Sequence, residues 1–82
     1  MNERELIAGF IQELINEPVS DHASNLFEQG FLTSLDVLDL LAFLENTFGL
    51  EISEEDVDME SFGTIDGLVG LVERKRNLGV RQ

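Results

Sequence analysis

The sequence predicts an all-α fold, a small four-helix bundle of three long helices and one short helix. Apolar residues recur at helical spacing in three segments, no segment alternates as a strand does, and 82 residues suit one domain, residues 1–82. Leu, Ile, Val and Phe supply 30 residues, a share well above that of disordered chains. We therefore expect the chain to fold despite a net charge of −12.

The first helix is expected over residues 3–16. Asn2 can cap its start, with Glu5 three residues later. Pro18 ends it, because the residue before a proline avoids the α region. The helix carries one wide apolar stripe, made of Leu6, Ile7, Phe10, Ile11, Leu14 and Ile15.

A loop of 17 residues, 17–33, follows the first helix. Loops of this length in compact domains are usually functional or disordered. Four apolar side chains argue against disorder and are expected to hold the loop on the bundle: Leu26, Phe27, Phe31 and Leu32. Gly30 is a candidate for a turn position with positive φ.

The second helix is expected over residues 34–48, stopped by Gly49, and it has two apolar faces. The core stripe consists of Val37, Leu40, Leu41, Leu44 and Phe48. The outer face consists of Leu35, Leu38 and Ala42, flanked by Asp39, Glu45 and Asn46. An apolar patch with a carboxylate rim suits docking of a basic partner. The alternatives are burial on both sides and, for Asp36 and Asp39, a favourable interaction with the helix dipole.

The third long helix is expected over residues 65–77, capped by Thr64. Its stripe is Ile65, Leu68, Val69 and Val72, and its last turn is expected to hold Arg74, Lys75 and Arg76. Gly67 and Gly70 each cost about 1 kcal/mol relative to Ala, so this helix depends on packing. The connector, residues 50–63, should contain one short helix over residues 59–62.

The charge distribution restricts the partners. From Glu5 to Glu73 there is no Lys or Arg, and 16 of the 17 acids lie in that stretch. The chain therefore lacks the basic patch that nucleic acid or an anionic membrane would need, and it favours basic protein partners. It has no Cys, no signal-peptide pattern at its start and no apolar run long enough for a membrane span. We expect a cytoplasmic monomer.

Ser34 stands where the long loop meets the second helix. Ser34 or Thr33 can cap the helix, and Thr33 with Asp36 has capping-box spacing. A hydroxyl here could also carry a phosphodiester, because the free N–H groups and the dipole at a helix start favour an anion. An arm attached through that phosphate would rise beside the outer face of the second helix.

These segments resemble the acyl carrier and peptidyl (aminoacyl) carrier protein family. The resemblance lies in Asn25-Leu26-Phe27-Glu28-Gln29-Gly30-Phe31-Leu32-Thr33-Ser34-Leu35-Asp36, in the acidic second helix, in Asn46-Thr47-Phe48-Gly49-Leu50-Glu51-Ile52, and in Ser61-Phe62-Gly63-Thr64-Ile65. It covers nearly the whole chain. It implies the acyl-carrier type of bundle and a discrete carrier protein.

The resemblance implies that Ser34 carries covalent 4′-phosphopantetheine from coenzyme A, whose thiol holds an acyl or aminoacyl thioester. It implies three kinds of partner: a phosphopantetheinyl transferase, a loading ligase or adenylation enzyme, and a downstream acyltransferase or synthase with a basic docking patch. The matching partner-contact positions are Leu35, Asp36, Leu38, Asp39, Ala42, Glu45 and Ile52.

Two positions depart from the usual acyl carrier pattern. Thr33 replaces the Asp that usually precedes the serine, and Gly30 lies four residues before Ser34, where many acyl carriers have it three before. The longer spacing is similar to that of D-alanyl carriers and leans toward an amino-acid or unusual acyl cargo.

Parts of the sequence suggest three other functions. Asp56-Val57-Asp58-Met59-Glu60 begins like a calcium loop, but Ser61 and Gly67 stand where such a loop needs Gly and a bidentate Glu. A serine hydrolase would have only His22 as its base, and His22 is expected to be an exposed loop residue. The remaining alternative is an acidic interaction module that is never covalently modified. We expect neither an enzyme nor a metal site.

Overall fold

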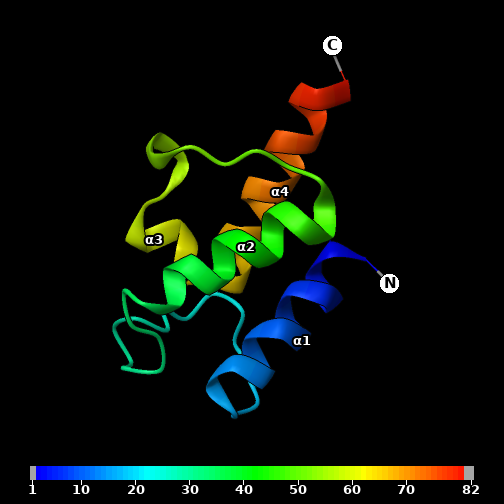
Figure 1. Ribbon diagram of the computed structural model, residues 1–82. Helices are drawn as coiled ribbons and strands as arrows, with labels where there is room; N and C mark the ends of the chain where they lie inside the picture. The colour runs from blue at the N-terminus through cyan, green and yellow to red at the C-terminus, as the bar shows by residue number, and fades with distance from the viewer. Residues whose placement is uncertain (1, 81–82) are drawn as a thin grey trace.

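The computed structural model describes residues 2–80, with the side chains of all of these except residues 54, 59 and 77–80. This part of the chain is all-helical: α1 (Glu3–Ile15), α2 (Asp36–Phe48), the 3-10 helix η1 (Glu54–Asp56), α3 (Met59–Phe62) and α4 (Ile65–Val80). In Figure 1, α2 crosses in front of α4, α1 lies below α2, and α3 lies at the side of the bundle. The predicted fold, three long helices and one short helix, is confirmed.

The predicted ends of α1 are confirmed to within a residue. The side-chain oxygen of Asn2 accepts the Glu5 N–H at 2.8 Å and so caps the first turn. Asn16 closes the other end in the left-handed conformation, with φ of 59°, and its N–H donates to the Gln12 carbonyl. Asparagine tolerates this conformation better than most residues do.

The start of α4 is as predicted, but its end is not. Thr64 Oγ1 accepts the Gly67 N–H at 2.8 Å, and the helix then continues to Val80, three residues beyond the expected end. Arg74, Lys75 and Arg76 therefore do not lie in the last turn. Lys75 instead pairs with Asp56 at 2.6 Å, and Arg76 pairs with Glu3.

The connector contains the predicted short helix α3, together with η1, which was not predicted. Asp58 caps α3 by accepting the Ser61 N–H at 2.7 Å. Asp56 closes η1, because its carboxylate accepts both the N–H and the hydroxyl of Ser53 at 3.0 Å. Ser53 and Asp56 have the three-residue spacing of a capping box, a sequence signal that could have revealed η1.

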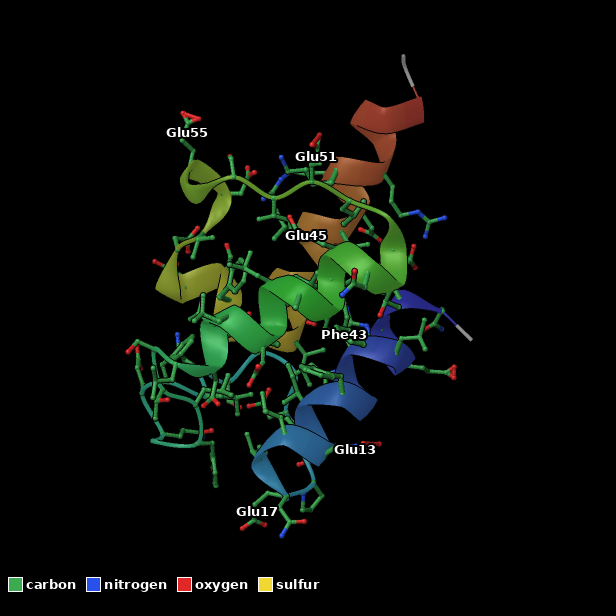
Figure 2. The ribbon with its side chains drawn as sticks, in the orientation of Figure 1. Glu13, Glu17, Phe43, Glu45, Glu51 and Glu55 are labelled. Atoms are coloured by element: carbon green, nitrogen blue, oxygen red, sulfur yellow. The ribbon has the colours of Figure 1, made fainter. Side chains whose placement is uncertain are left out.

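The buried core joins α1, α2 and α4 with α3 and two residues of the long loop. Its members are Ile7, Ile11, Leu26, Leu32, Leu40, Leu44, Phe62, Ile65, Leu68, Val69, Leu71 and Val72. The stripe predicted for α4 is wholly buried. Phe10 stacks on Phe43 with ring centroids 4.2 Å apart, and Figure 2 shows Phe43 on the side of α2 that faces α1.

The long loop is held by buried side chains and by hydrogen bonds to the corner between α3 and α4. Leu26 and Leu32 are buried and Phe27 packs against the core, as predicted. The prediction for Phe31 is wrong, because its side chain is 44% exposed. The Leu26 N–H donates to the Gly63 carbonyl at 2.7 Å, and the Asp66 N–H donates to the His22 carbonyl at 3.0 Å.

His22 is half-buried rather than exposed. Its Nδ1 lies 2.9 Å from Nη1 of Arg4, and Arg4 also pairs with Asp66 at 2.5 Å. Nδ1 can accept from the guanidinium only when it carries no proton, so the contact requires the Nε2–H tautomer. His22 therefore helps to join the loop to α1 and α4.

Gly67 marks a close approach between α4 and α3. A Cβ at this position would clash with the Ser61 carbonyl oxygen, whereas a Cβ at Gly70 would meet nothing within 4 Å. Gly67→Ala should lower the free energy of unfolding by about 1–3 kcal/mol, whereas Gly70→Ala should raise it by about 0.5–1 kcal/mol. Urea unfolding of the two variants measures both changes. Equal stabilisation by both would show that α3 does not press against Gly67.

Asp56 gives the fold a dependence on pH. The hydrogen bond from Lys75, aided by the Ser53 N–H, lowers the pKa of Asp56 from 3.8 to about 2. A folded pKa below the unfolded one means stabilisation that is complete above pH 4 and is lost as the pH falls toward 2. Asp56→Asn should therefore destabilise the protein near neutral pH, and the deficit should shrink over that acidic range. Urea titrations at several pH values measure it.

Glu55→Gln is the matched control for Asp56→Asn. Glu55 is exposed and has no hydrogen bond or ion pair to a described residue, and Figure 2 shows its side chain pointing away from the bundle. Its replacement should not lower stability. A deficit for Asp56→Asn that stayed constant down to pH 2 would contradict the titration of this pair.

Candidate functional site

Ser34 lies in an exposed turn between the long loop and α2. The helix begins at Asp36, two residues later than predicted, and Ser34 and Leu35 form the turn that leads into it. The Ser34 side chain is exposed, and its hydroxyl makes no hydrogen bond to any described residue. A second molecule can therefore reach the hydroxyl directly.

The predicted capping by Ser34 or Thr33 is wrong, and only the reverse half of the capping box forms. No side chain caps the first N–H groups of α2. Instead, Asp36 Oδ2 accepts the Thr33 N–H at 2.8 Å and the Thr33 hydroxyl at 3.3 Å. The Asp36 N–H in turn donates to the Thr33 carbonyl at 3.0 Å.

The turn before α2 leaves donors free beside the Ser34 hydroxyl. The backbone N–H groups of Ser34 and Leu35 have no acceptor among the described residues. Unpaired N–H groups at the start of a helix attract anions, and the dipole of the 13-residue α2 adds to that field. A phosphodiester on Ser34 would fit this position electrostatically.

The outer face of α2 is exposed, which excludes burial of the helix on two sides. Leu35 is 76% and Leu38 is 66% exposed, and Ala42 is exposed as well. On the opposite face Leu40 and Leu44 are fully buried. The two faces predicted for this helix are thus one core face and one free face.

The carboxylates around this outer face have different surroundings. Glu45 Oε2 accepts the Ile52 N–H at 3.0 Å, and Figure 2 shows Glu45 between α2 and the connector. Ile52 itself is partly buried against the core. Asp36 is bound to Thr33, whereas Asp39 is exposed and makes no hydrogen bond or ion pair with a described residue.

The described cations do not neutralise these carboxylates. Arg4 pairs with Asp66, Lys75 with Asp56 and Arg76 with Glu3, all away from the outer face of α2. Of the described cations only Arg74 lacks an ion pair, and it lies on α4. The negative field of α2 therefore remains available to a basic partner.

Phe31, which was predicted to help hold the long loop on the bundle, is an exposed apolar residue. It lines a depression of about 190 Å³ together with Ile15, Val19 and Leu26. Gly30, in the left-handed conformation with φ of 85°, turns the chain immediately before it. The neighbouring Leu32 takes the core position, and this alternation could have signalled that Phe31 faces outward.

The other candidate sites are occupied by structural contacts. The Asp56 carboxylate binds Lys75 and Ser53, and the described residues contain no group of three or more side chains that could hold a metal. His22 contacts Arg4 and forms no hydrogen bond with Ser34. No helix in the described part of the chain has the length and apolar character needed to cross a membrane.

A helical bundle that presents an exposed serine at the start of an acidic helix suits a small carrier module. The comparisons agree, because residues 5–72 match the family described as "Phosphopantetheine attachment site". The chain belongs to this family of acyl and peptidyl carrier proteins. Carriers of this family hold their cargo on a covalent 4′-phosphopantetheine arm, and this chain is such a carrier.

Curated relatives support the same assignment. The chain is 31% identical over 75 residues to the D-alanyl carrier protein of Enterococcus faecalis. The aligned region covers 89% of this chain and 96% of the relative. It is 30% identical over 81 residues to the acyl carrier protein of Thermotoga maritima, covering 92% and 98%. A D-alanyl carrier protein of Streptococcus suis is 31% identical over 75 residues, covering 89% and 95%.

The family determines the general mode of action. Carriers are generally not catalytic themselves, and they interact with the enzymes that modify and load them. The arm supplies the thiol on which the cargo forms a thioester, which suits a chain without Cys. An unmodified acidic interaction module is not favoured.

The exposure of Leu38 leads to a direct test of the outer face. Leu38→Asp should change the free energy of unfolding by no more than about 0.5 kcal/mol, because the side chain is mostly in water. Leu40→Asp is the matched control and should cost at least about 3 kcal/mol, because it places a charge in the core. Thermal unfolding followed by circular dichroism compares them. Comparable losses would mean that Leu38 is buried.

Proposed function

We propose that Ser34 is the residue that carries 4′-phosphopantetheine. The observation that carries this proposal is the exposed Ser34 hydroxyl, which has no hydrogen-bond partner among the described residues. It stands beside the N–H groups of Ser34 and Leu35, which have no acceptor there either. The segment before it also supports the proposal, because Gly30 and the buried Leu32 present this turn at the surface. A transferase can then add the arm without unfolding any part of the bundle.

Partner enzymes dock, in this proposal, on the outer face of α2. The apolar contacts are Leu35, Leu38, Ala42 and the partly buried Ile52, and the carboxylates around them are Asp39 and Glu45. Asp36, the remaining partner-contact position that the resemblance implies, is bound to Thr33. The proposed partners are a phosphopantetheinyl transferase, a loading ligase or adenylation enzyme, and an acyltransferase or synthase. Each would need a basic patch, because charge complementarity with the unneutralised carboxylates raises the rate of encounter.

We propose an aminoacyl group as the cargo, with another acyl group as the alternative. The support is the name of two relatives, D-alanyl carrier proteins, and the position of Gly30 four residues before Ser34. The described residues include no fully buried polar side chain that could read a cargo. The partner enzymes would then choose the cargo and perform the chemistry, and the domain of residues 1–82 would only present it.

The role of Ser34 can be tested by mass spectrometry. Wild-type protein incubated with coenzyme A and a broad-specificity phosphopantetheinyl transferase should gain one phosphopantetheine, and Ser34→Ala should gain none. Because the Ser34 hydroxyl forms no hydrogen bond with any described residue, this variant should keep its stability within about 0.5 kcal/mol. Intact mass and peptide mapping measure the attachment.

Ser20→Ala provides the control for that experiment. Ser20 is also an exposed loop serine with no hydrogen bond to a described residue, so its replacement should leave loading unchanged. Loading of Ser34→Ala, or attachment at another serine, would refute the assignment of the site. An unloaded wild-type protein with several transferases would do the same.

A further inference from the structure

We propose that Asp36 positions Ser34 for the attachment of the arm, acting through Thr33 rather than through contact with a partner. This inference rests on the proposed attachment at Ser34. It assigns to Asp36 a role different from that of Asp39, although both carboxylates lie in the first turn of α2.

The positioning contact is a set of hydrogen bonds between Thr33 and Asp36, which we call the bracket, and it spans residues 33–36. The Asp36 N–H donates to the Thr33 carbonyl at 3.0 Å. In the opposite direction, the Thr33 N–H donates to Asp36 Oδ2 at 2.8 Å, and the Thr33 hydroxyl adds a longer bond of 3.3 Å. Two bonds of opposite direction thus enclose Ser34 and Leu35 and restrict the backbone that carries the hydroxyl.

Nothing else among the described residues restrains Ser34 so directly. Its hydroxyl and its N–H have no partner there, and the Leu35 side chain is 76% exposed. The Ser34 carbonyl accepts only a long bond of 3.3 Å from the Val37 N–H. Removal of the Asp36 acceptor would free the Thr33 N–H and leave one short bond to close the turn.

The bracket connects two rigid parts of the protein. On one side, Leu32 is buried and its N–H donates to the Leu26 carbonyl at 3.1 Å. On the other side, Leu40 anchors α2 in the core. Between these anchors, movement of the turn would shift the Ser34 hydroxyl, and the hydrogen bonds of Asp36 to Thr33 restrain that movement.

The transfer reaction needs such a restraint. The Ser34 oxygen forms a bond to the phosphorus that carries the pantetheine half of coenzyme A. The bond from this phosphorus to the oxygen bridging to the nucleotide half breaks, and the hydroxyl proton leaves to a base of the transferase. Displacement in line requires the oxygen in a narrow range of positions, and a shift of 1 Å can cost about a hundredfold in rate.

Thr33 and Asp36 act as a pair in this role. The hydroxyl of Thr33 donates to Asp36, whereas the Asp usual at this position in acyl carriers would place a second carboxylate there. A carboxylate cannot donate, and two like charges repel. The donor hydroxyl that Thr33 has in place of the usual carboxylate is thus paired with an acceptor, the carboxylate of Asp36.

The test compares Asp36→Ala and Asp36→Asn with Asp39→Ala and Asp39→Asn in loading by one transferase. Asp36→Ala should lower kcat at least about tenfold with KM little changed. Asp36→Asn should keep kcat within about threefold of the wild type, because the amide oxygen still accepts the Thr33 N–H. Both Asp39 variants should raise KM and leave kcat unchanged. An equal rise of KM in the two Asp36 variants would overturn the proposal.

A second readout does not depend on loading. Amide hydrogen exchange of Thr33, followed by NMR in the unmodified protein, should be slow in the wild type and in Asp36→Asn and at least about tenfold faster in Asp36→Ala. Equal rates in all three would overturn the proposal. Loading of Ser34→Ala would refute only the attachment site, because the exchange rates would still report the bracket. If Asp36→Ala does not fold, Asp36→Asn against Asp39→Asn decides: a rise of KM in both would overturn the proposal.

Discussion

The attachment of Leu26 to the corner between α3 and α4 supports the rest of the functional end of this protein. Its side chain is 2% exposed, its N–H donates to the Gly63 carbonyl, and its own carbonyl accepts from Phe31 and Leu32 at 2.9 and 3.1 Å. A loop of this length would otherwise carry many unpaired backbone groups and much conformational freedom. Leu26 pairs backbone groups of the loop and restricts its conformations. The segment that runs from Leu26 to Ser34 is therefore held in one position relative to the core.

The small number of cations determines which carboxylates on the surface are paired. Three described cations form ion pairs that join α1 and η1 to α4. These pairs hold the edges of a bundle that its net charge of −12 would weaken. No described cation then pairs with a carboxylate of α2, so the helix that follows Ser34 keeps its negative charge. The ion pairs of the fold and the unpaired negative charge on α2 follow from one distribution of charge.

Helix α2 combines three duties along 13 residues. Its inner face belongs to the core, its outer face is free for partners, and its start presents Ser34. Two of its carboxylates secure the chain at either end, Asp36 at Thr33 and Glu45 at Ile52. A carrier must offer the same geometry to several enzymes in turn, and a platform held at both ends can do this without rearranging.

The sequence by itself determined the helices, their caps at Asn2 and Thr64, the core stripes and the carrier family, because these depend on local spacing and on a motif of consecutive residues. Tertiary structure decided what local spacing cannot encode. Phe31 faces outward because Leu32 takes the core position, and α4 continues past Asn77 while Lys75 and Arg76 reach Asp56 and Glu3. The same holds for the hydrogen bonds between Thr33 and Asp36. The three-residue spacing identifies the two partners, but only the path of the chain into α2 decides that the Asp36 side chain is the acceptor.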